Sequence, residues 1–352
     1  MRQGADLTGL FKREFELCHV REGEVVGILS DPTTRPVYVD AAVGAATALG
    51  GQVFHITVPG LGWDTPAPVK GMGASVPALA QPSPLLDAVT AALSKATFVV
   101  DLVHETIIHV PLRGVLRQAG ARILTVMEPP DVLERMFPPP GIKEEVEALV
   151  ERLNGASALR VTSSAGTEVT YDLEETKPFS QYGYSDVAGK WDHWPSALAV
   201  CYPKDGTADG TVVLQPGDIV FPFKRYVEEP VTLTLEKGYV VRIEGSLDAQ
   251  LIQDYLDSWA EPEVFAASHI GFGAHPRAQW SALAFYEKDE TIGMDGRCFK
   301  GNFLFSTGPN RETGRLVEAH LDVPMRGCDV FLDDDRVIAE GKIVEPQVAR
   351  VG

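Results

Sequence analysis

Apolar positions between residues 25 and 128 alternate between short continuous runs and segments with helical spacing. Such alternation is typical of buried strands separated by helices, as in an open parallel sheet covered on both faces. No G-x-G-x-x-G or G-x-x-x-x-G-K-[ST] motif follows any of the runs, which argues against a dinucleotide or nucleoside triphosphate site. The apolar runs lie at 25–29, 53–58, 98–103 and 123–126, with helical segments at 41–49, 85–93 and 110–118.

The pattern changes near residue 155, after a helix predicted over 143–153. Beyond it, short alternating strands separated by tight turns dominate, and one amphipathic helix is predicted over 247–259. We therefore expect an α/β fold with an open parallel-sheet α/β domain at 1–155, followed by a β-rich α+β metal-binding domain at 156–352. The predicted strands lie at 159–162, 168–171, 211–214, 231–235 and 239–243.

Composition narrows the class of protein. The 352 residues include 49 Asp and Glu against 31 Lys and Arg, a net charge of −18, and the basic residues are dispersed. Nucleic acid and anionic membrane are therefore poor partners. The four cysteines form no C-x-x-C pair, and no apolar run is long enough to cross a bilayer or to act as a signal sequence. These features favour a cytoplasmic protein with reduced thiols.

Two histidines and a carboxylate are candidate ligands of one metal ion. His320 and Asp322 stand two positions apart, so a strand would place both side chains on the same face. With His269 they would complete the ligand set of non-haem Fe(II) oxygenases. The alternative is that His320 is a solvent-facing strand residue and that Asp322 begins a turn before Pro324.

Two features beside these residues extend the metal hypothesis. His269 precedes Gly271 and Gly273, which would allow a close approach of the backbone to whatever His269 binds. Ser306 lies in a polar turn predicted after an apolar strand, where its hydroxyl could supply a fourth ligand. The alternative is that Ser306 only forms the turn.

Two further histidines are candidates for acid–base chemistry. His109 follows the carboxyl end of the strand at 98–103, where open parallel sheets bind ligands, although an ordinary helix-start role is equally compatible with the sequence. His193 lies between Trp191 and Trp194 in a segment that we expect to be an irregular loop. Trp and His could form an aromatic slot with His193 as acid or base, or the tryptophans could cap the edge of the core.

Several longer motifs resemble the 2,5-dihydroxypyridine 5,6-dioxygenase family, and the resemblance covers nearly the whole chain. The motifs are Trp191-Asp192-His193-Trp194-Pro195-Ser196, Pro222-Phe223-Lys224, Ser268-His269-Ile270-Gly271, Pro276-Arg277-Ala278-Gln279-Trp280, the segment 301–310, His320-Leu321-Asp322 and, in the first domain, 126–133.

The resemblance implies an Fe(II) enzyme on a scaffold related to metallo-aminopeptidases of the aminopeptidase T type. It implies that His269, Ser306, His320 and Asp322 hold the iron and that the enzyme cleaves the ring of 2,5-dihydroxypyridine with O2, giving N-formylmaleamate in nicotinate-type degradation. It also suggests a homo-oligomer, for which a hexamer is the expected size.

The same resemblance gives roles to residues on the substrate side. His193 would act as general base, and His109 would handle protons on the oxygen intermediate. Phe223 and Trp194 are our candidates for the walls of the slot. The family carries a Glu just before its Tyr-Gly-Tyr motif, whereas this chain has Gln181 there. An amide can hold an imidazole but cannot stabilise an imidazolium as an anion can.

Three alternatives to this function remain open from the sequence. The same chemistry could act on another hydroxypyridine, such as a trihydroxypyridine, because one substituent changes only a contact or two. A metallo-aminopeptidase would need bridging carboxylates, of which only Asp322 is evident. A small-molecule binding protein would leave the His, Ser and His-x-Asp positions unexplained.

Overall fold

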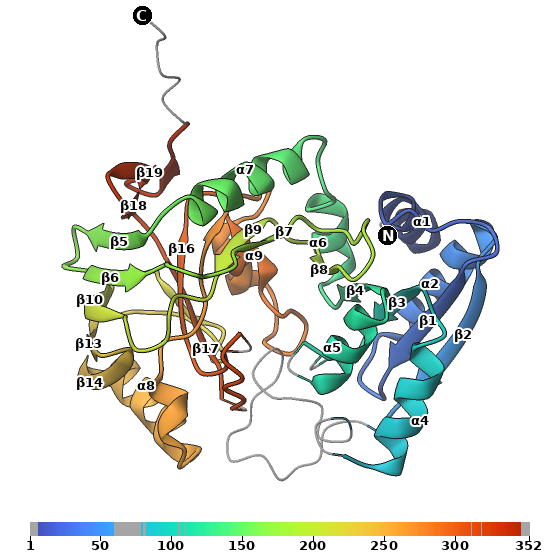
Figure 1. The fold of residues 1–352 in the computed structure, drawn as a ribbon, viewed down its shortest axis with the longest axis horizontal. Helices are drawn as coiled ribbons and strands as arrows, with labels where there is room; N and C mark the ends of the chain where they lie inside the picture. The colour runs from blue at the N-terminus through green and yellow to red at the C-terminus, as the bar shows by residue number, and fades with distance from the viewer. Residues whose placement is uncertain are drawn as a thin grey trace, which may run out of the picture. The chain divides into compact units, whose positions relative to one another are not determined.

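The computed structural model describes residues 6–59, 79, 82–104, 106–108, 110–310, 312–317 and 319–345 (Figure 1). The chain forms two compact units. Unit 1 comprises residues 1–140, 181–196 and 286–294, and unit 2 comprises residues 141–180, 197–285 and 295–352. None of the helices in these described residues is both long and apolar enough to span a membrane.

Unit 1 contains a five-stranded sheet in the order β2-β1-β3-β4-β8. Every neighbouring pair in it is parallel, as the alternating pattern of runs and helices predicts. The strands are β1 (Val25–Ser30), β2 (Gln52–Thr57), β3 (Phe98–Asp101), β4 (Arg122–Val126) and β8 (Trp191–Trp194). The helices are α1 (Leu7–Leu17), α2 (Pro36–Ala48), α4 (Pro84–Leu93), α5 (Pro111–Gln118) and α6 (Pro130–Arg135).

Strand β8 differs from the sequence-based expectation of an irregular loop, which is wrong. It pairs with β4, so that Thr125 lies opposite His193. All four of its residues are buried, including Asp192 and His193. A strand of this kind lacks apolar alternation, because its polar side chains are buried as deeply as its tryptophans.

The two units also differ from the two domains expected from the sequence, which would meet at a single boundary near residue 155. Helix α7 (Ile142–Asn154) groups with unit 2, where it contacts β9 (Leu198–Cys201). The segment 181–196 returns to unit 1 because β8 adds a parallel strand there. Local sequence patterns do not reveal such pairing between distant segments.

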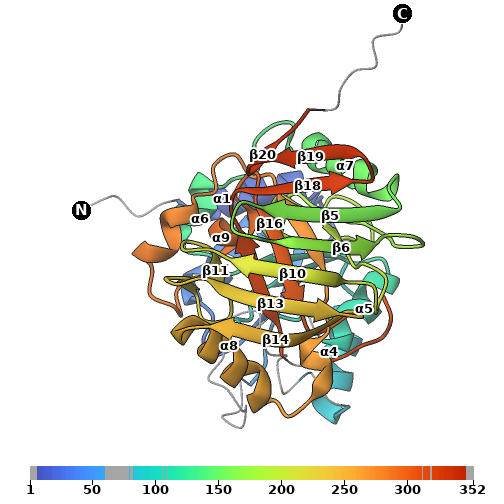
Figure 2. The same cartoon turned by 90° about the vertical axis from the view of Figure 1, so that its left-hand side faces the viewer.

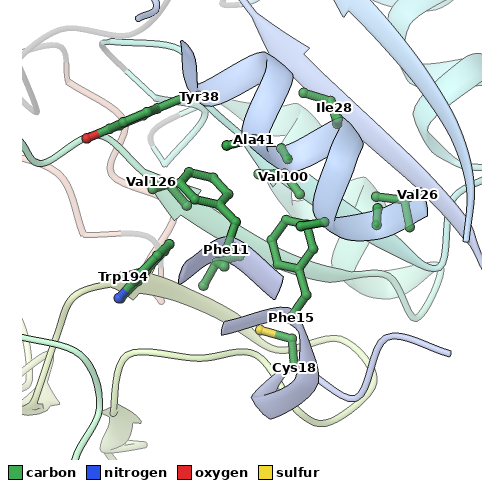
Figure 3. Close-up of a cluster of buried hydrophobic side chains, with 14 of the residues drawn as sticks. Phe11, Phe15, Cys18, Val26, Ile28, Tyr38, Ala41, Val100, Val126 and Trp194 are labelled. Carbon is green, nitrogen blue, oxygen red and sulfur yellow. The ribbon is translucent and has the colours of Figure 1, made fainter. Parts of the chain in front are cut away.

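The core of unit 1 lies where α1 and α2 pack on the sheet (Figure 3). Leu10, Phe11 and Phe15 form the apolar stripe of α1, with spacing close to one helical turn. The ring of Phe11 meets that of Trp194 edge-on at 5.1 Å. Burying a large apolar side chain stabilises a fold by roughly 1.5–3 kcal/mol, so this cluster ties α1 firmly to β8.

Unit 2 is built on antiparallel strands. An eight-stranded sheet has the order β14-β13-β10-β6-β5-β18-β19-β20, and strands β16 and β17 cross behind it (Figure 2). A second, five-stranded sheet has the order β17-β16-β15-β9-β7. The mixed α/β class expected from the sequence, with a parallel sheet followed by a β-rich region, is confirmed.

The remaining bounds in and beside unit 2 are as follows. The large sheet contains β5 (Ala158–Ser163), β6 (Glu168–Asp172), β10 (Asp209–Leu214), β13 (Val231–Glu236), β14 (Tyr239–Gly245), β18 (Cys328–Leu332), β19 (Asp335–Ala339) and β20 (Lys342–Ile343). The smaller sheet contains β7 (Phe179–Gln181), β15 (Ile270–Gly273), β16 (Phe303–Thr307) and β17 (Leu321–Met325). A hairpin joins β11 (Ile219–Val220) to β12 (Arg225–Tyr226); the helical elements are α8 (Leu247–Ser258), α9 (Met294–Cys298) and the 3-10 turns Pro262–Phe265 and Trp280–Phe285.

Candidate metal centre

Three adjacent strands of unit 2 bring the candidate ligands together. Ser306 on β16 lies directly opposite Asp322 on β17, and cross-strand partners present their side chains on the same face. His320 stands two positions before Asp322 and therefore points the same way. His269 immediately precedes β15, the strand on the other side of β16.

The side chains of His269, His320 and Asp322 converge on one point. Oδ1 of Asp322 lies 3.3 Å from Nε2 of His269 and 3.1 Å from Nε2 of His320. The three ligand atoms lie within 4.8 Å of one another. His320 and Asp322 are buried, and the His269 side chain is 14% exposed. The two-residue spacing of His320 and Asp322 therefore places both side chains on the same face, as expected of a strand.

The charges of this group suit a cation. Burial alone would raise the pKa of Asp322, but the neighbouring imidazoles of His320 and His269 outweigh it and hold the pKa well below its usual range. Burial lowers the pKa of His269, and the nearby carboxylate of Asp322 opposes this shift. At neutral pH the group thus offers a carboxylate and a neutral imidazole, the forms that coordinate metals.

A divalent transition metal fits this arrangement. Oδ1 of Asp322 is buried and receives no N–H or O–H hydrogen bond of regular geometry from the described residues, although two imidazole nitrogens face it. Buried polar atoms are normally hydrogen-bonded, so a group arranged in this way is suited to a cation between its members. Two nitrogen donors and one carboxylate oxygen are the donor set of non-haem iron sites.

Ser306 lies in a regular strand, which differs from the turn expected at this position. Its hydroxyl donates to the carbonyl of His269 at 2.5 Å and lies 3.1 Å from Nδ1 of the same ring. If Nδ1 donates to this oxygen, the tautomer leaves the Nε2 lone pair directed at Asp322. Ser306 is therefore adjacent to the group, and its hydroxyl contacts both the ring and the backbone of His269.

Two side chains that the sequence does not single out fix the ligands from behind. Arg297 on α9 donates its Nε hydrogen to Oδ2 of Asp322 at 2.9 Å. The hydroxyl of Tyr255 on α8 accepts the backbone N–H of His320 at 3.2 Å and lies 3.3 Å from the carbonyl oxygen of that residue. Both come from helices distant in sequence, so no local motif could have indicated them.

The glycines after His269 serve the packing of the backbone. A Cβ on Gly273 would lie 2.3 Å from the carbonyl oxygen of Phe299, and one on Gly271 would lie 2.9 Å from that of Ala199. The close approach expected at these positions is therefore between β15 and neighbouring segments of the chain. The glycines let the strand that follows His269 sit tightly in its sheet.

His193 belongs to unit 1 and is buried in β8. Its ring meets that of Trp191 edge-on at 4.8 Å, and its backbone N–H donates to Asp192 at 2.8 Å. The Trp191 indole N–H in turn donates to Thr125 at 3.1 Å. Burial raises the pKa of Asp192 to about 6, against the opposing charge of Lys190.

The other predicted site residues have separate places. Trp194 packs in the core of unit 1, and the aromatic ring beside His193 is that of Trp191. Gln181 is buried at the end of β7. Phe223, in unit 2, is half-buried with its ring 5.6 Å from that of Tyr255. His109 lies outside the described residues.

Comparisons with known proteins bear on this site. The profile of the family described as 2,5-dihydroxypyridine 5,6-dioxygenase matches residues 6–345. A protein of Pseudomonas putida KT2440 with that name is 39% identical over 350 residues, covering 98% of each chain. The solved structure of 2,5-dihydroxypyridine dioxygenase from that organism matches with a TM-score of 0.92 at 38% identity, covering 99% of both chains.

A more distant likeness concerns the scaffold. The structure of AmpT from Thermus thermophilus matches with a TM-score of 0.64 at 12% identity, covering 97% of this chain and 99% of that one. At this identity the likeness shows the fold alone.

Proposed function

The chain belongs to the 2,5-dihydroxypyridine 5,6-dioxygenase family, and from this we propose that it opens the ring of 2,5-dihydroxypyridine with O2 to give N-formylmaleamate. The observation that carries the proposal is the convergence of His269, His320 and Asp322 on one point in unit 2. The substrate is a small planar N-heterocycle, and its ring opening belongs to the degradation of nicotinate-type compounds.

The proposed cofactor is Fe(II), held by His269, His320 and Asp322, with the Ser306 hydroxyl as a fourth ligand. A ferrous ion at this place would supply the redox chemistry that lets O2 react with an aromatic ring. The buried, low-pKa carboxylate and the neutral His269 support divalent cation binding at neutral pH. The cross-strand pairing of Ser306 with Asp322 supports a role for its hydroxyl.

The proposed proton chemistry belongs to histidines of unit 1. His193 takes the proton of a ring hydroxyl as general base, which makes the ring more electron-rich. His109 handles protons later in the reaction, a role proposed from the family resemblance. Gln181 stands where the family has a carboxylate, so we propose that an amide, and not an anion, orients His193 from this position.

The proposed contact with the flat face of the ring falls to aromatic side chains. Phe223 forms one wall of the proposed slot for the substrate ring, because its own ring is only half-buried against Tyr255. Trp191 replaces Trp194 as the tryptophan beside the base, because the ring of Trp194 is committed to the core. Aromatic faces accommodate planar rings with little loss of conformational entropy.

Two-metal peptide hydrolysis is a weaker explanation of the same residues. It requires carboxylates that bridge two ions, and the group of His269, His320 and Asp322 contains one carboxylate. On the strength of the family we also propose a cytoplasmic homo-oligomer, with a hexamer as the expected assembly.

Turnover by the iron-loaded protein tests the proposal. Protein reconstituted with Fe(II) is mixed anaerobically with 2,5-dihydroxypyridine, O2 is admitted, and the ring absorbance and dissolved O2 are followed. We expect one O2 consumed per ring lost, with no reaction for His320→Ala and full activity for the exposed control His19→Asn. Reaction of a trihydroxypyridine but not of 2,5-dihydroxypyridine would contradict the proposed substrate.

A further inference from the structure

Asp322 differs from a freely rotating carboxylate because its two oxygens have different neighbours. Oδ1 faces the imidazoles of His269 and His320. Oδ2 lies 2.9 Å from Nε of Arg297 and accepts its hydrogen. A charge-assisted hydrogen bond of this length is among the stronger ones in proteins, particularly where water is excluded. The carboxylate is therefore held in one orientation.

Arg297 is itself fixed in place. Its side chain is 3% exposed, and its guanidinium lies 3.7 Å from the ring centroid of Phe221. Phe221 exchanges backbone hydrogen bonds with Asp322 at 2.9 and 3.2 Å, so the aromatic platform under Arg297 is bonded to the residue that Arg297 holds. Cation–π contact of this kind is strongest for a desolvated arginine.

The backbone of Arg297 is also anchored to the strand that follows His269. The side-chain amide of Asn302 donates to the Arg297 carbonyl at 2.7 Å, and its oxygen accepts the N–H of Gly273 at 2.5 Å. Asn302 is fully buried. Arg297 is thus fixed relative to β17, through its hydrogen bond to Asp322, and relative to β15, through Asn302 and Gly273. A surface ion pair would not fix a side chain to this extent.

We propose that Arg297 is a positioning residue that restricts Asp322 to binding a cation through Oδ1 alone. This inference rests on the proposed function. A carboxylate that binds through both oxygens occupies two coordination positions, whereas one bound through a single oxygen occupies one. Arg297 therefore keeps one more position available for exogenous ligands, and a reaction that brings together a ring oxygen and O2 needs such positions.

Two neutral replacements of similar length separate the hydrogen bond from the charge. Arg297→Gln retains a donor for Oδ2, and Arg297→Met retains neither donor nor charge. Mn(II) is the probe, because the relaxation of water protons rises with the number of exchangeable waters on the bound ion. The same replacement at the exposed Arg326, whose guanidinium lies 3.9 Å from the ring centroid of Trp280, is the matched control.

We expect Arg297→Met to bind Mn(II) with one exchangeable water fewer than Arg297→Gln, the Arg326→Met control and the unaltered protein. Equal water counts in the two Arg297 variants, whatever their affinities, would overturn the inference. Absence of Mn(II) binding by the unaltered protein would instead count against the proposed function, on which the inference depends.

A second measurement does not require Arg297→Met to fold. In Asp322→Asn only the amide oxygen can accept from Arg297, so the amide NH2 would face the imidazoles and oppose a cation. We expect Mn(II) affinity to fall by more than about 100-fold, the upper end of typical effects around metal ligands. Retention of affinity within about tenfold would show that the side chain is free to turn, and would overturn the inference.

Discussion

The hydroxyl of Tyr255 lies within hydrogen-bond distance of both backbone polar groups of His320, 3.2 Å from its N–H nitrogen and 3.3 Å from its carbonyl oxygen. Tyr255 is buried on α8, and His320 lies just before β17, so this pair ties a helix to the segment that presents a candidate metal ligand. Three of the candidate ligands therefore have a dedicated partner: Tyr255 for His320, Arg297 for Asp322, and the Ser306 hydroxyl for His269.

Removing the Tyr255 hydroxyl tests the first of these partnerships. Tyr255→Phe leaves the His320 N–H without its partner, which costs about 1–2 kcal/mol of stability and loosens the ligand. We expect Fe(II) affinity to fall by roughly tenfold. Tyr239→Phe removes a hydroxyl bonded to Glu263 in the same unit and serves as the control. Equal metal affinity in both variants would contradict a positioning role for Tyr255.

The hydroxyl of Ser306 can be tested against its neighbour on the same strand. Ser306→Ala should weaken metal binding by about 10–100-fold, because it removes either a ligand atom or the partner of Nδ1 of His269. Thr307→Val is the control, since the buried Thr307 hydroxyl has no hydrogen-bond partner in the part of the chain that the structure describes and valine has the same shape. Metal titrations of both variants decide the matter, and unchanged affinity in Ser306→Ala would exclude either role.

The amide of Gln181 leads to a prediction about how activity depends on pH. If its side chain faces His193, Gln181→Glu adds an anion that stabilises the imidazolium and raises the pKa of the base. The acidic limb of the kcat/KM profile should then move to higher pH, since the free base forms later. Superimposable profiles for the two proteins would show that residue 181 does not act on His193, the proposed base.

The buried carboxyl of Asp101 leads us to expect that the free energy of unfolding depends on pH. Its carboxyl is fully buried at the end of β3, and burial raises its pKa to about 7, against hydrogen bonds from Ile107, Val103 and Thr125. Between the ordinary pKa of 3.8 and 7, the folded state keeps a proton that the unfolded state releases. Stability from this group is therefore complete below pH 3.8 and is lost as the pH rises through 7.

The measurement compares Asp101→Asn with the unaltered protein by urea unfolding. The variant should gain stability relative to the unaltered protein between pH 4 and pH 8, by up to about 4 kcal/mol, because an amide cannot ionise. A stability difference that does not change with pH would contradict a neutral Asp101 in the folded protein.

The sequence predicted the parts of the site that depend on local geometry. His320 and Asp322 share a face because strand side chains alternate, and the structure places His269 beside them. The parallel sheet of unit 1 was also evident from its apolar runs. In each case the information lies within a few residues, which is where periodicity is informative.

The rest depends on contacts between distant segments. The buried Asp192 of β8 is satisfied by the N–H groups of Tyr182, Gly183 and His193 and by Lys190, and these partners make a polar strand possible inside the sheet. Arg297 and Tyr255 reach the ligands from helices with no motif of their own. Tertiary contacts thus determined the features that local patterns did not reveal.

The fate of the oxygen atoms tests the central claim most directly. The iron-loaded protein is given 2,5-dihydroxypyridine under 18O2 in ordinary water, and the open-chain product is analysed at once by mass spectrometry. Ring cleavage by a dioxygenase predicts two heavy oxygen atoms in each product molecule and no product from His320→Ala. A product that carries its new oxygen from water, or one that forms equally well in His320→Ala, would contradict the account.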